Sequence, residues 1–308
     1  MILAALAMLT ATPATLPAIL TASKGGDVVV LEAGVYGNPG LRRRAFSPPL
    51  TIDARRATLE RWVVSDVIGL TVRGGAWSPG CSVFPCYNYG LVFQRGANLR
   101  VESATFTGSE KTAPGELYVQ ADGYGVGFLG SSDVALSGNL FQSLRVGASL
   151  AKITGFQIIG NRFTRMRSDG LDVAQGWKGL IEGNVCDGTR LLTTEHADCF
   201  QLWSRPDAPP TSDIVIRRNV AASDAQGIGM FNHVRNGVDD GGFDRILIEE
   251  NDIRSPFANG IGLVNARASV VRNNQVRTMP GAKYVSRIHT VGDVLRCGNV
   301  STTIEPPC

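Results

Sequence analysis

One pattern of apolar and polar positions recurs along most of the chain. It reads apolar-x-apolar-x-x-Asn-x-apolar, as in Val134, Leu136, Asn139 and Phe141. Its asparagines are separated by 22, 23, 35, 32, 23 and 25 residues, at Asn139, Asn161, Asn184, Asn219, Asn251, Asn274 and Asn299. A base period of 22–25 residues, with two intervals longer by about ten, is typical of a solenoid with loop insertions on its binding face.

Within each unit, apolar and polar residues alternate over short runs that end at Gly or Asn, and no helical period is sustained. We therefore expect an all-β fold, a right-handed parallel β-helix with three short strands per coil. The asparagine is expected to take the left-handed conformation at a turn and to hydrogen-bond its counterparts in a ladder. Weaker copies at residues 70–75 and 99–103 place Gly75 and Ser103 at the asparagine position, and residues 16–22 are expected to form a short cap helix.

Composition narrows the class of protein. The 308 residues include 36 glycines without a Gly-X-Y period, which excludes collagen, and the 44% hydrophobic content excludes a disordered chain. No stretch of the sequence reaches the roughly 18 consecutive apolar residues that a membrane span needs. A net charge of +3 is too small to indicate nucleic-acid binding.

The amino terminus and the cysteines indicate export. An apolar run over residues 2–9, followed by Thr12, Pro13 and Ala14, is similar to a secretory signal, although no basic residue precedes it. We expect residues 1–14 to be a signal peptide and residues 15–308 a single, monomeric domain that is secreted or periplasmic. Export would let the six cysteines pair, but six allow 15 connectivities and spacing does not choose among them.

Residues 24–36, with the sequence KGGDVVVLEAGVY, resemble the first coil of the pectate-lyase-like β-helix superfamily. This superfamily includes polysaccharide lyases, polygalacturonase-type hydrolases and uronate epimerases. The resemblance covers nearly the whole chain as an architecture, and it implies a polysaccharide substrate without choosing the reaction.

Aligning the coils on their asparagines stacks a second set of segments into columns. The first column contains Tyr124, Arg145, Asp169, Asp198, Gln226 and Asn259, and another places Asp172 beside Gln201. Adjacent coils lie about 4.8 Å apart, so Asp169 and Asp198 should be neighbours, with Arg145 one coil below. Two like charges this close need a cation or a shared proton. The alternative is that each Asp only caps a turn.

Several residues near this column are candidates for the site. The predicted catalytic residues are Asp169, Asp172, His196 and Asp198, and the three aspartates are also candidate Ca²⁺ ligands; no other cofactor is expected. The predicted substrate-binding residues are Arg145, Lys178, Gln201, Trp203, Arg205, Gln226, Phe231 and His233. The aromatic rings suit stacking on sugars, and Lys178 and Arg205 suit a substrate carboxylate. Trp203 could instead pack against an insertion, and His233 could have a structural role in its loop.

Residues 169–172 and 197–199 resemble the Asn-Thr-Asp-Gly-x-Asp and Asp-Asp-Cys segments of polygalacturonases. Asp169 and Asp198 match that pattern, whereas Ala197 stands where the family has Asp and Gln226 stands where it has His. An inverting hydrolase would then use Asp172 with Asp198, about 6.5–9.5 Å apart. For elimination, the aspartates would hold Ca²⁺, Arg145 would bind the uronate, and His196 or Arg205 would be the base.

Gly170-Leu171-Asp172 is also similar to the Gly-Phe-Asp segment of alginate epimerases, but the Pro-His that follows in that family is Val173-Ala174 here. We therefore expect a secreted enzyme that cleaves an acidic, uronate-containing polysaccharide. β-Elimination is placed ahead of hydrolysis, and epimerisation third. The non-enzymatic alternative is a glycan-binding or adhesion β-helix in which the acidic column is structural.

Overall fold

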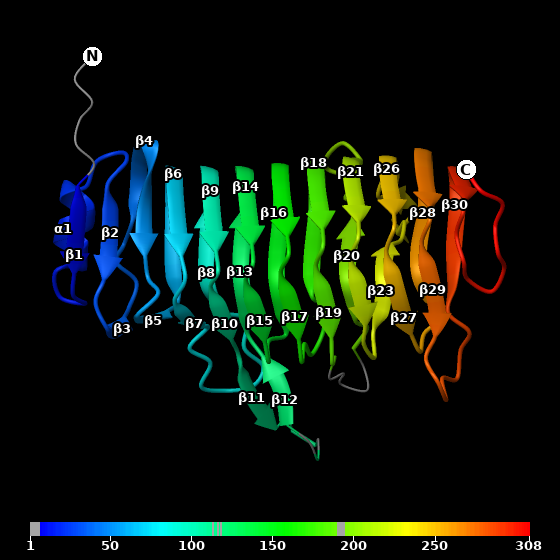
Figure 1. The fold of residues 1–308 in the computed structure, drawn as a ribbon, viewed down its shortest axis with the longest axis horizontal. Coiled ribbons are helices and arrows are strands. Elements are labelled where there is room, and N and C mark those ends of the chain that lie inside the picture. The colour runs from blue at the N-terminus through cyan, green and yellow to red at the C-terminus, as the bar shows by residue number, and fades with distance from the viewer. Residues whose placement is uncertain (1–6, 113, 116, 118, 190–194) are drawn as a thin grey trace.

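The structure is a computed structural model that describes residues 7–112, 114–115, 117, 119–189 and 195–308. Its strands stack into one elongated parallel β-helix, with a short helix at the N-terminal end and the last long strand at the other (Figure 1). Two faces belong to one long sheet and the third face to a second sheet.

Long strands of the first sheet pass from one face to the next through a bend, as at Gln175 (φ 60°) and Lys178 (φ 58°). Within the described residues this sheet contains β1 (Met8–Ala11), β2 (Val28–Leu31), β4 (Arg42–Asp53), β6 (Trp62–Arg73), β8 (Tyr89–Gln94), β9 (Ala97–Glu102), β13 (Tyr124–Leu129), β14 (Ser132–Ser137), β16 (Val146–Ile159), β18 (Leu171–Glu182), β20 (Asp198–Trp203), β21 (Thr211–Arg217), β23 (Gln226–Met230), β26 (Phe243–Glu249), β28 (Asn259–Arg272) and β30 (Arg287–Cys297).

Short strands close the third face. They are β3 (Gly34–Tyr36), β5 (Ala57–Glu60), β7 (Ala76–Ser78), β10 (Thr105–Thr107), β15 (Leu140–Gln142), β17 (Arg162–Thr164), β19 (Val185–Asp187), β22 (Val220–Ala222), β27 (Asp252–Ser255) and β29 (Gln275–Thr278). Two antiparallel hairpins pair β11 (Ser109–Thr112) with β12 (Val119–Asp122) and β24 (Val234–Arg235) with β25 (Val238–Asp239), and the first of them projects from the coils in Figure 1.

The predicted asparagine ladder is confirmed. Each asparagine from Asn139 to Asn274 donates its Nδ2 to the Oδ1 of the next one at 2.9–3.0 Å. The predicted left-handed conformation of the asparagine is wrong, because the residue before it has the positive φ, as at Arg218 (53°) and Glu250 (56°). Asparagine recurs because one amide both donates and accepts, which satisfies buried polar groups of adjacent coils.

The ladder begins on the backbone of Ala104, whose N–H donates to Asn139 Oδ1 at 2.9 Å. Strand β14 pairs Ser137 with Glu102, so Ser103 lies opposite Gly138. The asparagine position of this coil is therefore Ala104, and the prediction of Ser103 is one residue off.

Aromatic side chains form a second stack inside the coils. The rings of Phe106, Phe141 and Phe163 lie parallel, with 5.0 Å between successive centroids. This spacing follows the distance between neighbouring strands, so each of these three coils adds one ring to the stack.

The predicted cap helix is confirmed as α1 (Leu16–Ala22), which covers the end of the core with Leu16 and Leu20. Residues 1–6 of the predicted signal peptide lie outside the described residues. In the described remainder, Met8–Ala11 forms β1 and pairs with β2, and the cleavage of residues 1–14 stays a prediction. No helix in the described ranges has the length and apolarity needed to cross a membrane.

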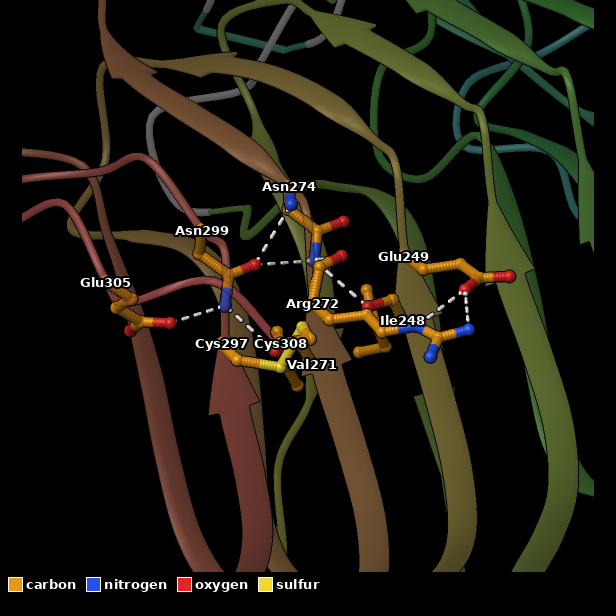
Figure 2. Close-up of a disulfide and its surroundings, with 9 residues drawn as sticks. All are labelled: Ile248, Glu249, Val271, Arg272, Asn274, Cys297, Asn299, Glu305 and Cys308. Atoms are coloured by element: carbon orange, nitrogen blue, oxygen red, sulfur yellow. Dashed lines mark hydrogen bonds and ion pairs between the residues drawn. A yellow bond between two sulfur atoms is a disulfide. The ribbon is translucent and has the colours of Figure 1, made fainter.

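All six cysteines are paired, as Cys81–Cys86, Cys186–Cys199 and Cys297–Cys308. The last disulfide holds the C-terminal tail against the final coil (Figure 2). There Asn299, the last member of the ladder, donates to Glu305 Oε2 at 2.6 Å. The tail therefore supplies the acceptor that a further coil would otherwise provide.

Candidate active site

Three buried carboxyls meet on one face of the β-helix, as the columns predict. The backbone N–H of Asp198 donates to Asp169 Oδ1 at 2.7 Å, and the Ser168 hydroxyl donates to Asp169 Oδ2 at 2.9 Å. Asp172 on β18 pairs with Gln201 on β20. We refer to Asp169, Asp172 and Asp198 as the acidic cluster.

Burial raises the pKa of all three carboxyls, and repulsion from a neighbouring carboxylate adds to it for Asp169 and Asp172. The pKa of Asp169 rises to about 7, first by burial and then by the charge of Asp198. Burial, followed by the charge of Asp169, raises the pKa of Asp172 well above its ordinary value. Burial also raises the pKa of Asp198, but the hydrogen bond from His196 opposes this effect. Adjacent carboxyls cannot all ionise, so the cluster favours the protonated form of Asp172, while His196 favours an ionised Asp198.

His196 covers the acidic cluster. Its Nδ1 lies 3.1 Å from Asp198 Oδ2, and its Nε2 contacts the amide of Gln226. The hydrogen bond to Asp198 is the largest of the effects that raise the pKa of His196. Gln201 also donates to Asp198 Oδ2, at 3.0 Å. Gln201 and Gln226, predicted to bind substrate, therefore contact the catalytic candidates directly. Gln201 positions the carboxylate of Asp198, and Gln226 positions the imidazole of His196.

The next coil leaves room for Asp198. A Cβ atom at Gly229 would lie 2.6 Å from Asp198 Oδ1, so any side chain at this position would displace the carboxylate. Asp198 Oδ1 and Asp172 Oδ1 are buried and have no hydrogen-bond partner among the described residues. Unpartnered buried oxygens are costly in a purely structural ladder.

Arg145 is one residue away from its predicted column. Strand β13 pairs Tyr124 with Val146, so Val146 and not Arg145 is in line with Tyr124 and Asp169. The charge of Arg145 nevertheless lowers the pKa of Asp172, against the larger effect of burial.

Tyr87 and Tyr89, which were not predicted, form a group with Tyr124 of the first column beside Arg145. Tyr89 and Tyr124 have ring centroids 4.8 Å apart, and Arg145 lies 5.1 Å from the ring of Tyr87 and donates to the Tyr124 hydroxyl at 2.6 Å. Burial, with a smaller effect of Asp172, raises the pKa of Tyr89 and of Tyr124. Strand β13 pairs Tyr124 with Tyr89. Extending the first column by one coil towards the N terminus would therefore have identified Tyr89.

The remaining candidates lie in three places. Trp203, Arg205 and His233 line one cavity of about 400 Å³. Phe231 lies close to the next coil, because a Cβ atom at Gly262 would meet its ring. Lys178 lines a different, shallower depression with Arg100, so the structure does not bring it to the acidic cluster.

The fit of the acidic cluster to Ca²⁺ is poor. In the described part of the chain, no three His, Cys, Asp or Glu side chains are grouped closely enough to hold a metal ion. Asp169 uses both oxygens in hydrogen bonds, and Asp172 favours its protonated form. Calcium binding stays a prediction, and no step proposed below depends on a metal.

Residues 79–276 match the model of the right-handed β-helix region, and the chain belongs to this family. The predicted right-handed parallel β-helix is thereby confirmed. No curated protein matches the chain significantly in sequence.

Solved structures show how widely the fold is used. The chain is similar to the Dettilon tailspike protein, with a TM-score of 0.64, 13% identity and coverage of 94% of this chain and 61% of the tailspike. It is also similar to PfbA, a surface adhesin of Streptococcus pneumoniae (TM-score 0.58, 10% identity, 92% and 82% covered). A third is the endo-xylogalacturonan hydrolase from Aspergillus tubingensis (TM-score 0.58, 11% identity, 97% and 98% covered). The chain thus spans 61% of the tailspike's length, and identities this low show the fold alone. Function has to be argued from the site.

Proposed function

We propose that the protein is an enzyme that cleaves a uronate-containing polysaccharide by β-elimination, with His196 as the base and Asp172 as the acid. The observation that carries the proposal is the pair of His196 and Asp198, 3.1 Å apart, beside Asp172, a carboxyl whose pKa burial raises well above its ordinary value. Pairs of titratable groups with opposite protonation states are the usual parts of acid–base catalysis. A structural ladder has no need of them.

The proposed reaction begins with proton abstraction by His196 and ends with proton donation by Asp172. The Gln226 amide moves aside, and His196 Nε2 takes the proton from C5 of a uronate. The electrons of the C5–H bond form a double bond between C4 and C5. The C4–O bond breaks, and its electron pair goes to the glycosidic oxygen, which takes the proton of Asp172. Proton transfer through water from His196 to Asp172 restores the starting state.

Arg145 supports this step electrostatically. Negative charge builds up on the uronate carboxylate as the C5 proton leaves, and a fixed guanidinium nearby stabilises it. Arg145 is held between Tyr124 and Glu195, with Nε 3.5 Å from Glu195 Oε1, so its position is set before substrate binds.

Elimination is favoured over hydrolysis by the nature of the base. A proton on carbon is a weak acid, and an imidazole is a stronger base than an ordinary carboxylate. An imidazole whose pKa is raised by Asp198 suits this task. Hydrolysis is the second candidate, supported by the presence of three carboxyls: Asp198 would activate water while Asp172 protonates the leaving oxygen.

The proposed location is outside the cytoplasm. Three disulfides close all six cysteines, and such bonds persist in oxidising compartments. A polysaccharide substrate is consistent with this location.

The test is incubation with a panel of uronate polysaccharides, with and without a chelator. Rising ultraviolet absorbance from unsaturated sugars supports elimination, whereas new reducing ends without that absorbance support hydrolysis. Asp198→Asn should reduce either signal about a hundredfold or more, and Asp133→Asn, an exposed aspartate paired with Arg100, should leave it unchanged. Binding without either signal would support the adhesion alternative. Loss of activity with the chelator would support the predicted binding of Ca²⁺.

A further inference from the structure

A pocket adjoins the acidic cluster along strand β20. The residues around it are Trp203, Ser204, Arg205, Pro206, His233, Val238 and Asp240, and its volume is about 400 Å³. Trp203 lies two residues beyond Gln201, on the same face of the strand and therefore about 7 Å along it. Since Gln201 donates to Asp198 at 3.0 Å, the pocket begins about one sugar residue away from the proposed acid and base.

The pocket is lined by the indole of Trp203 and by two side chains, Arg205 and His233, that can donate hydrogen bonds to a ligand. Within the described part of the chain, neither Arg205 nor the imidazole of His233 makes an ion pair or a side-chain hydrogen bond. Asp240 does not neutralise them directly, because its carboxylate accepts the backbone N–H groups of His233 (2.7 Å) and Gly242 (3.0 Å). The side chains of Arg205 and His233 thus remain available to a ligand.

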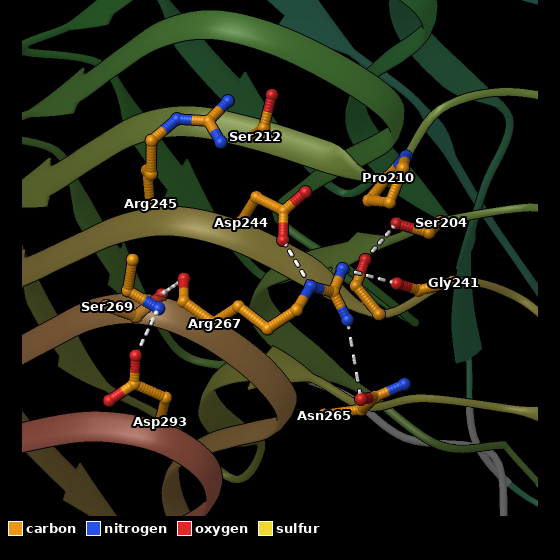
Figure 3. A network of polar contacts seen from close by, with 12 residues as sticks. Ser204, Pro210, Ser212, Gly241, Asp244, Arg245, Asn265, Arg267, Ser269 and Asp293 are labelled. Carbon is orange, nitrogen blue, oxygen red and sulfur yellow. Dashed lines mark hydrogen bonds and ion pairs between the residues drawn. The ribbon is translucent and has the colours of Figure 1, made fainter.

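The two loops that form the pocket are held in place. In the first loop, Asp207 accepts hydrogen bonds from Lys152 at 3.1 Å and Gln175 at 2.7 Å. The second loop is tied to β28, where Arg267 donates to the carbonyl of Gly241 at 2.6 Å and pairs with Asp244 (Figure 3). A pocket whose walls are fixed before binding loses less entropy when a ligand enters.

We propose that this pocket is a subsite for a sugar that carries a carboxylate, next to the sugar bound at the acidic cluster. The Arg205 guanidinium binds the carboxylate through two parallel hydrogen bonds, His233 donates a further one, and the indole of Trp203 stacks on the apolar face of the ring. Substrate selection then depends on the charge of the neighbouring sugar as well as on the sugar that reacts. This inference rests on the proposed function only in taking a polysaccharide as the ligand.

The test measures binding separately from turnover. Tetrasaccharides of galacturonate, glucuronate, mannuronate and guluronate, and the same oligosaccharides with their carboxyls reduced to alcohols, are titrated calorimetrically into the inactive variant Asp198→Asn, with Asp172→Asn as a second inactive background. At least one uronate should bind about tenfold or more tightly than its reduced counterpart. Adding Arg205→Gln should remove that preference, and Trp203→Ala should weaken both forms. Arg254→Gln, which removes a surface arginine paired with Asp252, should change neither.

The subsite is refuted if every uronate binds no better than its reduced form, or if Arg205→Gln weakens both forms equally. The two proposals can fail separately. An Arg205-dependent preference in a protein that cleaves no glycan would overturn the proposed function and keep the subsite. Cleavage that is indifferent to Arg205→Gln would keep the function and overturn the subsite.

Discussion

His196 Nδ1 lies 3.1 Å from Asp198 Oδ2, and this carboxylate is fully buried beneath the imidazole. The contact raises the pKa of His196, so the imidazole becomes a free base only at a pH above its ordinary value. Asp172 has to be protonated, and its pKa is also raised. We therefore expect a bell-shaped pH profile of kcat/KM, whose rising limb follows His196 and whose falling limb follows Asp172.

The Asp198→Asn variant tests the assignment of the rising limb. Asparagine does not stabilise the imidazolium, so the pKa of His196 falls and the rising limb of any residual activity moves to lower pH. The rate should drop about a hundredfold or more. If the rising limb stayed in place in this variant, His196 would not be the base.

The raised pKa of Asp172 also predicts an effect on stability. A carboxyl whose pKa is higher in the folded than in the unfolded state stabilises the fold at low pH, and this contribution is lost as the pH rises from its unfolded value of about 4 towards its folded value. Asp172→Asn cannot ionise and escapes the loss. We expect it to melt a few degrees above wild type at pH 8, to lose that advantage at pH 5, and to be inactive.

Asp213→Asn is the matched control for this stability effect. The pKa of Asp213 is lowered to about 2, chiefly by its hydrogen bond with Arg245, so its contribution is present above the unfolded pKa and is lost as the pH falls. This variant should melt at or slightly below wild type at pH 8. A lower melting temperature for Asp172→Asn at pH 8 would contradict the assignment of a protonated, mutually repelled carboxyl.

The asparagine spacing alone is enough to predict the β-helix, because every coil from Asn139 to Asn299 repeats the same buried hydrogen-bonding position. The spacing does not reveal which residue of the turn has the left-handed backbone conformation. Gly138, Arg218 and Glu250 share a positive φ but no side-chain chemistry, so the recurring Asn is mistaken for the turn residue. The same lack of a side-chain marker shifts the weaker copy from Ala104 to Ser103.

Within the site, the column alignment correctly places Asp169 beside Asp198 and Asp172 beside Gln201, since strand spacing is constant. It misplaces Arg145, because the coil before β16 has one residue more between its asparagine and its strand than the alignment assumes. Lys178 lies only six residues after Asp172, but the bend at Gln175 and Lys178 carries it onto another face. Tyr87 escapes detection because it precedes β8 in a loop, outside the repeat.

The ladder should be a major source of stability. In Asn219→Ala, the backbone N–H and the Nδ2 of Asn184 lose their shared acceptor, and the carbonyl of Ile181 loses its donor. Leaving such buried groups unpaired should cost about 2 kcal/mol or more. Chemical denaturation should detect this loss, and Asn38→Ala, in an exposed N-terminal turn, should cost far less. Equal effects of the two variants would exclude a stabilising ladder.

The Cys186–Cys199 disulfide should support both stability and activity. It closes a loop with a sequence separation of 13 that contains His196 and Asp198, and such a crosslink contributes about 3 kcal/mol. We expect Cys186→Ala/Cys199→Ala to be destabilised by about that amount and to lose most of its activity. Cys297→Ala/Cys308→Ala opens a similar separation of 11 at the far end of the β-helix, and it should lose stability while the remaining folded enzyme keeps its kcat.

Gly229 should be required for the position of Asp198. In Gly229→Ala the new methyl group would lie 2.6 Å from Asp198 Oδ1, closer than van der Waals contact allows, so the carboxylate has to move away from His196 and Gln201. Such a displacement should reduce kcat about a hundredfold, with a smaller change in KM and a pH profile whose rising limb is shifted as in Asp198→Asn. Gly37→Ala, where the added methyl group meets nothing within 4 Å, should leave kcat unchanged. A Gly229→Ala enzyme with normal kcat and the normal rising limb would show that Asp198 does not need this position, and that His196 acts without it.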